Sequence, residues 1–282
     1  MPFIPLIGLN NIGATCFMNS TLQCLSQTKS LTNYFLDNKN KDNIINNNIA
    51  LTNKNELQLS PIYFELITKL WDKNGNCKSF SPYNFMNTVE KMNSLFKQGQ
   101  AGDSKDFIIY ILEQLHKELK RSIKHNNNTM NESLNQYDQR NSLNHFYNDF
   151  KEECSIISDI FFGITETTNE CINCKNNYNS KGLQNPICYN YQIFNCLIFP
   201  LEEVKNMKNN SMQNNNYDQF DSVTLYDCFC FYQKVDYCTG QNQFYCDICK
   251  QLSDFICTTK IFSSPNYLVL ILNRGKDDIF NV

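Results

Sequence analysis

Residues 8–25, GLNNIGATCFMNSTLQCL, place Cys16 between a polar turn that contains Gly13 and a run of residues with helical character. Cysteine attacks as its thiolate, and the N-terminus of a helix stabilises that charge through unpaired backbone N–H groups and the helix dipole. A buried structural cysteine is the alternative, because free cysteine is among the residue types most often buried. The position alone leaves both interpretations open.

The residues before Cys16 favour the reactive interpretation. Asn11 precedes Cys16 by five positions and carries a side-chain amide donor. This amide and the backbone N–H of Cys16 can face the same point, where the oxyanion of an acyl-transfer reaction would form. Gly13 permits the close backbone approach that such an arrangement needs.

The whole stretch resembles the cysteine box of the ubiquitin-specific proteases, a large papain-like family of deubiquitinating enzymes. The matching residues are Gly8, Leu9, Asn11, Gly13, Thr15, Cys16, Asn19, Ser20, Gln23 and Leu25. The resemblance implies that Cys16 is the nucleophile and that Asn11 donates to the oxyanion. It also implies that ubiquitin and ubiquitinated proteins are the partners.

The composition is that of a globular protein without a nucleic-acid footprint. The chain has 282 residues, 41% of them hydrophobic, which is enough for one large domain or two ordinary ones. The formal net charge is -3 and the pI is near 5.7, with charges of both signs mixed along the chain. We therefore expect no nucleic-acid partner.

Membrane and secretory signals are also not expected. The longest apolar run near the C-terminus, residues 268–272, is far shorter than the roughly 20 residues of a membrane span. Residues 1–9 are apolar but lack the basic region and the cleavage site of a signal peptide. We expect no membrane partner and a cytoplasmic or nuclear location, where the 14 cysteines are thiols, metal ligands or a nucleophile before disulfides.

Helical patterns dominate the first part of the chain. Ser60 and Ser81 each precede a proline, which predicts hydroxyl caps and helices over residues 61–73 and 82–96. A third helix follows Asp103 as its cap, with one apolar stripe at helical spacing. The stripe consists of Ile108, Ile111, Leu112, Leu115 and Leu119.

Short β-rich runs dominate the second part, which indicates an α+β enzyme rather than a doubly wound sheet. The predicted strands are residues 156–166, 191–197, 255–262 and 267–273, and residues 223–234 are predicted to form a helix. Three asparagine-rich tracts, residues 38–55, 125–144 and 206–217, have too little apolar content to bury. We expect them to be mobile surface insertions.

Two CxxC pairs, Cys171 with Cys174 and Cys246 with Cys249, each form a possible knuckle that supplies two thiolates to tetrahedral zinc. A redox motif is the alternative, but one CxxC at a strand-to-helix turn would be enough for that chemistry. The resemblance implies a structural zinc ribbon in a β-rich fingers subdomain and no catalytic cofactor. Cys228, Cys230 and Cys238 can compete as ligands but are interpreted as core or surface thiols.

Residues 102–107, GDSKDF, resemble part of the family's Gln-Asp-Ala-X-Glu-Phe element. Asp103 and Phe107 match, and Asp106 replaces the glutamate of the family. The resemblance implies that Asp103 and Asp106 bind basic residues near the C-terminal tail of ubiquitin through charge-assisted hydrogen bonds. Simple capping of the helix is the alternative, and the two roles are compatible.

Further landmarks extend the resemblance over nearly the whole chain and imply one papain-like α+β catalytic domain with a helical thumb, zinc-ribbon β fingers and an incomplete β palm. They are Trp71, the Ser81-Pro82 pair with Phe85, and residues 265–274, which resemble a palm strand, although Gly275 stands where an aromatic residue is usual. The expected parts are a thumb over 1–124, an asparagine-rich insertion over 125–145, fingers and part of the palm over 146–264, and the start of the last palm segment over 265–282.

A cysteine nucleophile of this kind needs a histidine base. His116 is interpreted as a partly buried residue of its helix, while His125 and His145 lie in or beside an asparagine-rich tract. The family's histidine lies after the palm strand, so we expect it beyond Val282 in a longer chain. The predicted function is thiol-dependent hydrolysis at the C-terminal glycine of ubiquitin, and the alternative is an inactive ubiquitin-binding or scaffold protein.

Overall fold

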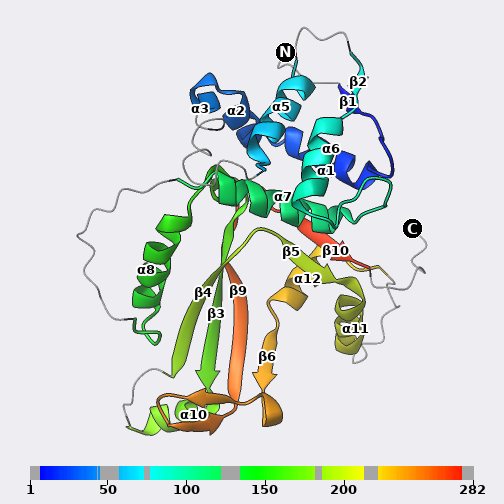
Figure 1. Ribbon diagram of the computed structural model, residues 1–282. Helices are drawn as coiled ribbons and strands as arrows, with labels where there is room; N and C mark the ends of the chain where they lie inside the picture. The colour runs from blue at the N-terminus through cyan, green and yellow to red at the C-terminus, as the bar shows by residue number, and fades with distance from the viewer. Residues whose placement is uncertain are drawn as a thin grey trace. The chain divides into compact units, whose positions relative to one another are not determined.

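The computed structural model describes residues 7–42, 44, 57–72, 77–121, 134–181, 186–212 and 222–274. The chain forms two compact units. The first unit comprises Met1–Ser122 and Glu153–Phe161, and the second comprises Ile123–Glu152 and Phe162–Val282. The first is mainly helical, whereas the second contains the four-stranded sheet (Figure 1).

The described elements of the first unit are helices around one short parallel strand pair. The helices are α1 (Cys16–Ser26), α2 (Lys29–Leu36), α3 (Asn38–Asp42), α5 (Ser60–Leu70), α6 (Tyr83–Met92), α7 (Ser104–Glu118) and α9 (Ile156–Phe161), and the strands are β1 (Gly8–Leu9) and β2 (Ser79–Phe80). Their apolar faces form the core, in which Met18, Leu22, Phe35, Tyr63 and Phe107 are fully buried. The predicted helices and the apolar stripe of α7 are confirmed, although α6 ends at Met92 because Asn93 is extended.

The predicted hydroxyl caps at Ser60 and Ser81 are wrong. Ser60 is itself the first residue of α5, and the Glu118 carboxylate accepts the backbone N–H groups of Leu59 at 2.9 Å and Ser60 at 2.7 Å. The Ser81 hydroxyl instead accepts from Asn10 Nδ2 at 3.0 Å. A charged acceptor from α7 therefore replaces the local cap of α5, because a carboxylate binds two N–H groups at once.

The second unit contains an antiparallel sheet in the strand order β4-β3-β9-β6, whose long strands lie side by side in Figure 1. The bounds are β3 (Gly163–Cys171), β4 (Ile187–Phe194), β6 (Val235–Cys238) and β9 (Phe255–Ser263). Helix α8 (Gln139–Phe150) packs against β4. Glu166 of β3 is buried under this helix and accepts hydrogen bonds from Gln139 and Tyr191, while Lys260 is its ion-pair partner.

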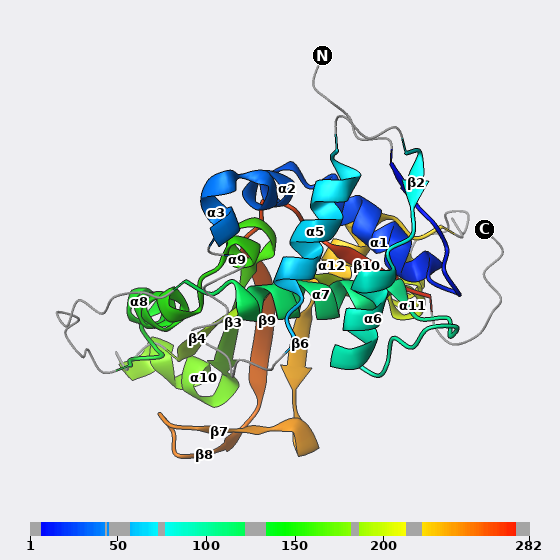
Figure 2. The same cartoon turned by 45° about the horizontal axis from the view of Figure 1, so that its top comes forward.

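One end of this sheet carries helix α10 (Ile172–Lys181), which follows β3 directly. The same end carries a hairpin of β7 (Phe244–Cys246) and β8 (Gln251–Ser253), shown in Figure 2.

The second unit also contains a separate parallel strand pair, β5 (Leu197–Pro200) with β10 (Leu270–Asn273). This pair packs with α11 (Leu201–Met212) and α12 (Leu225–Tyr232). The predicted helix near residues 223–234 is confirmed as α12, and the predicted strands over 255–262 and 267–273 are confirmed as β9 and β10 with shifted bounds.

The predicted strand over residues 156–166 is wrong in its first half, which forms α9. The Ser155 hydroxyl accepts the backbone N–H groups of Ile157 at 3.1 Å and Ser158 at 3.2 Å, and so starts a helix. Ile157, Ile160 and Phe161 are buried at helical spacing, and the strand begins only at Gly163. A short apolar run is compatible with a strand or with a helix, and here the Ser155 cap favours the helix.

The asparagine-rich tracts are not wholly loops. Helices α3, α8 and α11 extend into residues 38–55, 125–144 and 206–217 respectively, so the expectation of mobile insertions is wrong for their helical parts. Residues 45–55, 125–133 and 213–217 of these tracts lie outside the described residues. No helix in the described part of the chain is long and apolar enough to cross a membrane.

Candidate active site and metal centre

Cys16 is the first residue of α1, and its side chain is exposed, while Phe17 and Met18 after it are buried. The exposure argues against the structural alternative for Cys16. Thr15 gives α1 no side-chain cap, so the first-turn N–H groups are not occupied by a capping oxygen. A negative charge at the Cys16 side of the helix therefore meets unpaired donors and the positive end of the helix dipole.

The turn before Cys16 is folded around the side chain of Asn11. Asn11 Oδ1 accepts from Thr15 N at 3.0 Å, Thr15 Oγ1 at 3.2 Å and Gly13 N at 3.3 Å. Gly13 has φ of 119° and Ala14 has φ of 54°, so two consecutive residues adopt left-handed conformations. The amide oxygen of Asn11 is therefore used within the turn, and Nδ2 is the donor that the same amide can offer.

The side chains of α1 also fix the strand that leads into this turn. Asn19 Nδ2 donates to the carbonyl oxygen of Asn10 at 3.0 Å and to that of Leu9 at 3.4 Å. Gln23 Nε2, four residues further along α1, donates to the carbonyl oxygen of Ile7 at 3.1 Å. The helix that begins with Cys16 thus holds the backbone immediately before Asn11.

Two other segments hold the same turn from elsewhere in the first unit. The backbone N–H groups of Gly8 and Asn10 donate to Lys78 and Phe80 in the β1–β2 pairing, at 2.8 and 2.9 Å. On the other side, Gln98 Nε2 donates to the carbonyl oxygen of Ile12 at 3.2 Å. Few of these contacts were predictable, because the partners are far away in sequence.

Asp103 caps α7, as predicted: its Oδ1 accepts the backbone N–H of Lys105 at 2.7 Å. Asp106 lies in the first turn, exposed, and pairs with Lys105 at 3.5 Å. Gly102 lies against the ring of Phe17, where an added Cβ would be 2.6 Å from the ring carbon Cζ. Phe17 follows Cys16, and Gly102 precedes Asp103, so one close contact connects the segments that carry the two candidate site residues.

The two histidines in the described part of the chain, His116 and His145, each have a side-chain partner. His116 is half-buried on α7, as predicted, and its Nδ1 lies 2.7 Å from the Ser155 hydroxyl oxygen. Burial lowers the pKa of His116, and the charge of Lys120 lowers it further. His145 lies on α8 beside Asp149 at 3.1 Å, and His125 lies outside the described residues.

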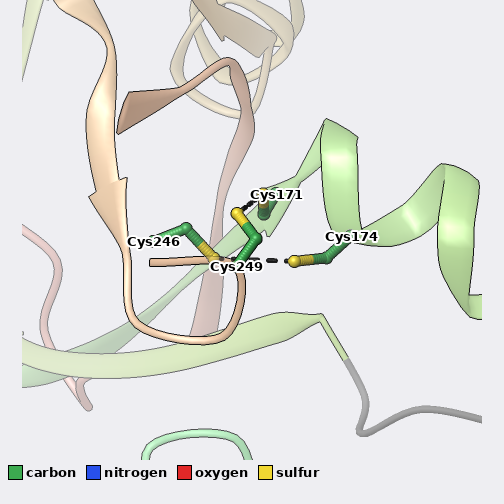
Figure 3. Close-up of side chains that lie close together, drawn as sticks. All are labelled: Cys171, Cys174, Cys246 and Cys249. Carbon is green, nitrogen blue, oxygen red and sulfur yellow. Dashed lines mark hydrogen bonds between the residues drawn. The ribbon is translucent and has the colours of Figure 1, made fainter. Parts of the chain in front are cut away.

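The second unit brings the two CxxC pairs together. The four sulfur atoms lie within 4.8 Å of one another, and Figure 3 shows their side chains converging. Cys171 Sγ is 3.9 Å from Cys249 Sγ, and Cys174 Sγ is 3.6 Å from Cys246 Sγ. Cys171 ends β3 and Cys174 lies in the first turn of α10, whereas the second pair frames the turn between β7 and β8. The four cysteines can hold a metal ion.

The electrostatics of this cluster fit a bound cation. Burial raises the pKa of Cys174 and of Cys246, although the backbone N–H groups of Ile248 and Cys249 oppose the shift at Cys246. Burial acts the same way on Cys249, but hydrogen bonds from Ser253 and the neighbouring thiols outweigh it and lower its pKa to about 7. Four clustered thiolates in a largely buried site need a compensating positive charge.

The remaining cysteines of interest lie outside this cluster of four. Cys228 is buried and Cys230 is exposed on α12, which agrees with their interpretation as core and surface thiols. Cys238 lies at the end of β6, and its Sγ is 3.3 Å from Cys257 Sγ on β9. The CxxC spacing does not indicate this pair, because Cys238 and Cys257 become neighbours only when β6 pairs with β9.

Comparison of the sequence with known proteins identifies related hydrolases. The family model described as ubiquitin carboxyl-terminal hydrolase matches residues 7–280. Ubiquitin carboxyl-terminal hydrolase 15 of Homo sapiens is 34% identical over 169 residues, which cover 60% of this chain and 17% of that protein. Ubiquitin carboxyl-terminal hydrolase 12 of Saccharomyces cerevisiae is 32% identical over 181 residues, which cover 60% of this chain and 14% of that protein.

Solved structures show the same fold. The SAGA Ubp8/Sgf11/Sus1/Sgf73 DUB module bound to ubiquitin aldehyde matches with a TM-score of 0.61 and 20% identity, over 96% of this chain and 47% of that chain. The SAGA DUB module bound to monoubiquitin matches with a TM-score of 0.62 and 18% identity, over 97% and 50% of the two chains. The predicted papain-like α+β fold is confirmed, and the match over residues 7–280 shows that this chain belongs to the ubiquitin carboxyl-terminal hydrolase family.

Proposed function

We propose that this chain carries the nucleophile and oxyanion donors of a cysteine deubiquitinase, which hydrolyses the bond at the C-terminal glycine of ubiquitin. The observation that carries the proposal is the exposed Cys16 at the start of α1, preceded by a turn that is built around the amide oxygen of Asn11. Family membership supports ubiquitin as the substrate. The match to the relative in Homo sapiens spans 17% of that protein's length.

In the proposed reaction, the Cys16 thiolate attacks the carbonyl carbon of the terminal glycine. Asn11 Nδ2 and the backbone N–H of Cys16 hold the oxyanion of the tetrahedral intermediate. The amine leaves with a proton from a general acid–base group, and the same group then deprotonates the water that hydrolyses the thioester. Donors fixed before the reaction stabilise this charge strongly, and loss of one of them typically costs about 10²- to 10³-fold in kcat.

The acidic start of α7 is proposed to bind the basic residues near the C-terminal tail of ubiquitin. Asp106 is exposed and has only a long ion pair with Lys105, so its carboxylate can accept hydrogen bonds from a substrate arginine. One Asp103 oxygen is used in the cap of α7. Asp106 is therefore the better candidate for a direct contact, with Asp103 ordering the turn.

We propose zinc as the ion held by Cys171, Cys174, Cys246 and Cys249, in a structural role. A set of four thiolates with no water position is typical of structural zinc sites. The ion would connect α10 at the end of β3 to the β7–β8 turn, and it would supply no step of the catalytic chemistry.

We also propose a reducing location, the cytoplasm or the nucleus, which the 14 free cysteines support. Imaging of a fluorescent fusion tests this location.

Hydrolysis of ubiquitin bearing a C-terminal fluorogenic amide tests the proposed function. We expect cleavage by the full-length wild-type protein, loss of cleavage in Cys16→Ala and retention in Cys24→Ala, since Cys24 is an exposed thiol on the same helix. Cleavage that survives in Cys16→Ala contradicts the proposal. Ubiquitin binding without cleavage by the wild type also contradicts it, and supports a scaffold protein instead.

A further inference from the structure

Beside the cluster of four cysteines, the sheet of the second unit contains another pair of thiols. Cys238 Sγ and Cys257 Sγ are 3.3 Å apart, closer than either of the sulfur pairs measured within the cluster, at 3.6 and 3.9 Å. Both side chains are partly exposed. A disulfide bond is about 2.0 Å long, so the two sulfur atoms must approach by about 1.3 Å to form one.

The ladder between β6 and β9 holds the two cysteines in this relation. Cys238 pairs with Phe255 and Asp236 pairs with Cys257, so the two thiols occupy diagonal positions on one face of the sheet. Diagonal neighbours on adjacent antiparallel strands lie within reach of each other. The proximity therefore follows from strand register and does not depend on a flexible loop.

The segment between these cysteines contains half of the metal cluster. Cys238 and Cys257 are separated by 19 positions, and Cys246 and Cys249 lie between them with the β7–β8 hairpin. The other two cluster cysteines belong to β3 and α10. A bond between Cys238 and Cys257 would close this segment into a loop without using any cluster thiol.

We propose that Cys238 and Cys257 form an oxidisable dithiol, and that their disulfide closes the segment carrying Cys246 and Cys249 and slows the loss of bound metal. The oxidant is a peroxide. One thiolate attacks an oxygen of the peroxide and breaks the O–O bond, which gives a sulfenic acid and a hydroxide or alkoxide ion that takes up a proton from solvent. The second thiol then attacks the sulfenic sulfur, which forms the disulfide and releases water.

Metal retention follows from chain entropy. When the ion is released, the Cys246–Cys249 turn becomes free to move. If a disulfide closes the segment that carries this turn, the segment has fewer conformations in which its thiols lie far from the other two cysteines. The disulfide therefore favours recapture of the ion over its escape. The retention claim rests on the proposed metal centre, whereas formation of the disulfide does not.

Peptide mapping after peroxide treatment tests the disulfide. The native protein is oxidised with hydrogen peroxide, its remaining thiols are alkylated, and disulfide-linked peptides are identified by mass spectrometry. We expect a Cys238–Cys257 crosslink in the wild type and in Cys188→Ser, and none in Cys257→Ser. Cys188 is a fair control because it faces Asn169, the residue of β3 that also pairs with Cys257. A crosslink between cluster cysteines in place of this pair overturns the proposal.

Metal release into a chromogenic chelator tests the consequence. We expect release from the oxidised wild type to be at least about tenfold slower than from the reduced protein, with no such difference in Cys257→Ser. Equal release rates, or faster release after oxidation, overturn the retention claim. Protein that contains no metal refutes the metal centre and retention together, while the mapping still decides whether the dithiol forms.

Discussion

At the residue scale, the proposed oxyanion donor, Asn11, depends on a neighbour that does not itself contact the substrate in the proposed reaction. Asn19 donates to the carbonyl groups of Leu9 and Asn10, and Asn11 follows directly in the chain. Asn19 lies one helical turn after Cys16, so nucleophile and oxyanion turn are held by the same helix. Asn19 is therefore a positioning residue.

We predict that Asn19→Ala lowers kcat for a ubiquitin amide by about 10- to 100-fold with little change in KM, because the oxyanion forms only after binding. Alkylation of Cys16 by iodoacetamide forms no oxyanion, so its rate should be the same in Asn19→Ala as in the wild type. Ser20→Ala is the control, since the Ser20 hydroxyl bonds only within α1 to Phe17. Parallel losses of hydrolysis and alkylation would indicate general damage to α1 instead.

Asp227 shows how one carboxylate links stability to pH. Hydrogen bonds from Lys208 and from the backbone and hydroxyl of Thr224 lower the pKa of Asp227 from 3.8 to about 2. Because the folded-state pKa is below the unfolded value, this stability is complete above about pH 4 and is lost as the pH falls toward 2.

We therefore predict that Asp227→Asn lowers the free energy of unfolding by about 1–2 kcal/mol at pH 7, and by much less near pH 2. Urea unfolding at both pH values measures the difference. Asp236→Asn is the control, because Asp236 is exposed and has only a long ion pair with Lys234. A loss of equal size at both pH values would contradict the assigned role of the charge.

At the element scale, α8 is fixed to the sheet through polar as well as aromatic contacts. Glu166 is 1% exposed and accepts from Gln139 at 2.8 Å and from the Tyr191 hydroxyl at 2.5 Å. Its other oxygen lies 2.6 Å from Lys260 Nζ. Burial opposes ionisation of Glu166, but these partners outweigh it and lower its pKa. The folded structure therefore stabilises the ionised form of Glu166.

Glu166→Ala should destabilise the second unit by about 2–4 kcal/mol, because the buried Tyr191 hydroxyl and the Gln139 amide lose their acceptor. Hydrogen exchange should rise in α8 and β4 and stay unchanged in α1. Glu170→Ala is the matched control on the same strand, since Glu170 pairs with the exposed Lys175. Equal effects of both substitutions would contradict the importance of burial.

The sequence predicted elements well where the signal was local, and failed where a distant partner decided the structure. The stripe of α7 and its Asp103 cap were predictable from spacing alone. The start of α5 was not, because Glu118 replaces the expected Ser60 cap from 58 positions away. Likewise, the sequence indicated Asn11 and Cys16 as candidate site residues. It did not indicate that Asn19 donates to the carbonyl groups of Leu9 and Asn10, because that contact exists only in the folded chain.

At the scale of the whole molecule, the four cluster cysteines lie on segments that meet only after the sheet has formed. Cys171 and Cys246 are separated by 75 positions in the chain, and the residues between them include β4, β5 and β6. The motif spacing indicated the two cysteine pairs, and their convergence is a property of the folded second unit.

Metal analysis of the purified protein should find about one zinc per chain, because binding to such a site is coupled to folding. Removal with a strong chelator should abolish protection from hydrogen exchange in β7, β8 and α10 and leave α1 protected. Cys249→Ser should lose the metal, whereas Cys230→Ser, at an exposed thiol of α12, should keep it. A folded, metal-free β7–β8 hairpin would refute the metal centre.

The central claim is that Cys16 is the nucleophile of a ubiquitin hydrolase, and labelling with ubiquitin that carries a C-terminal electrophile tests it most directly. Intact-mass and peptide analysis should find one ubiquitin adduct, located on Cys16, and no adduct in Cys16→Ala. Cys24 is an internal control, because it is also exposed on α1 but does not begin the helix. An adduct on Cys24, or ubiquitin that binds without reacting, would contradict the account.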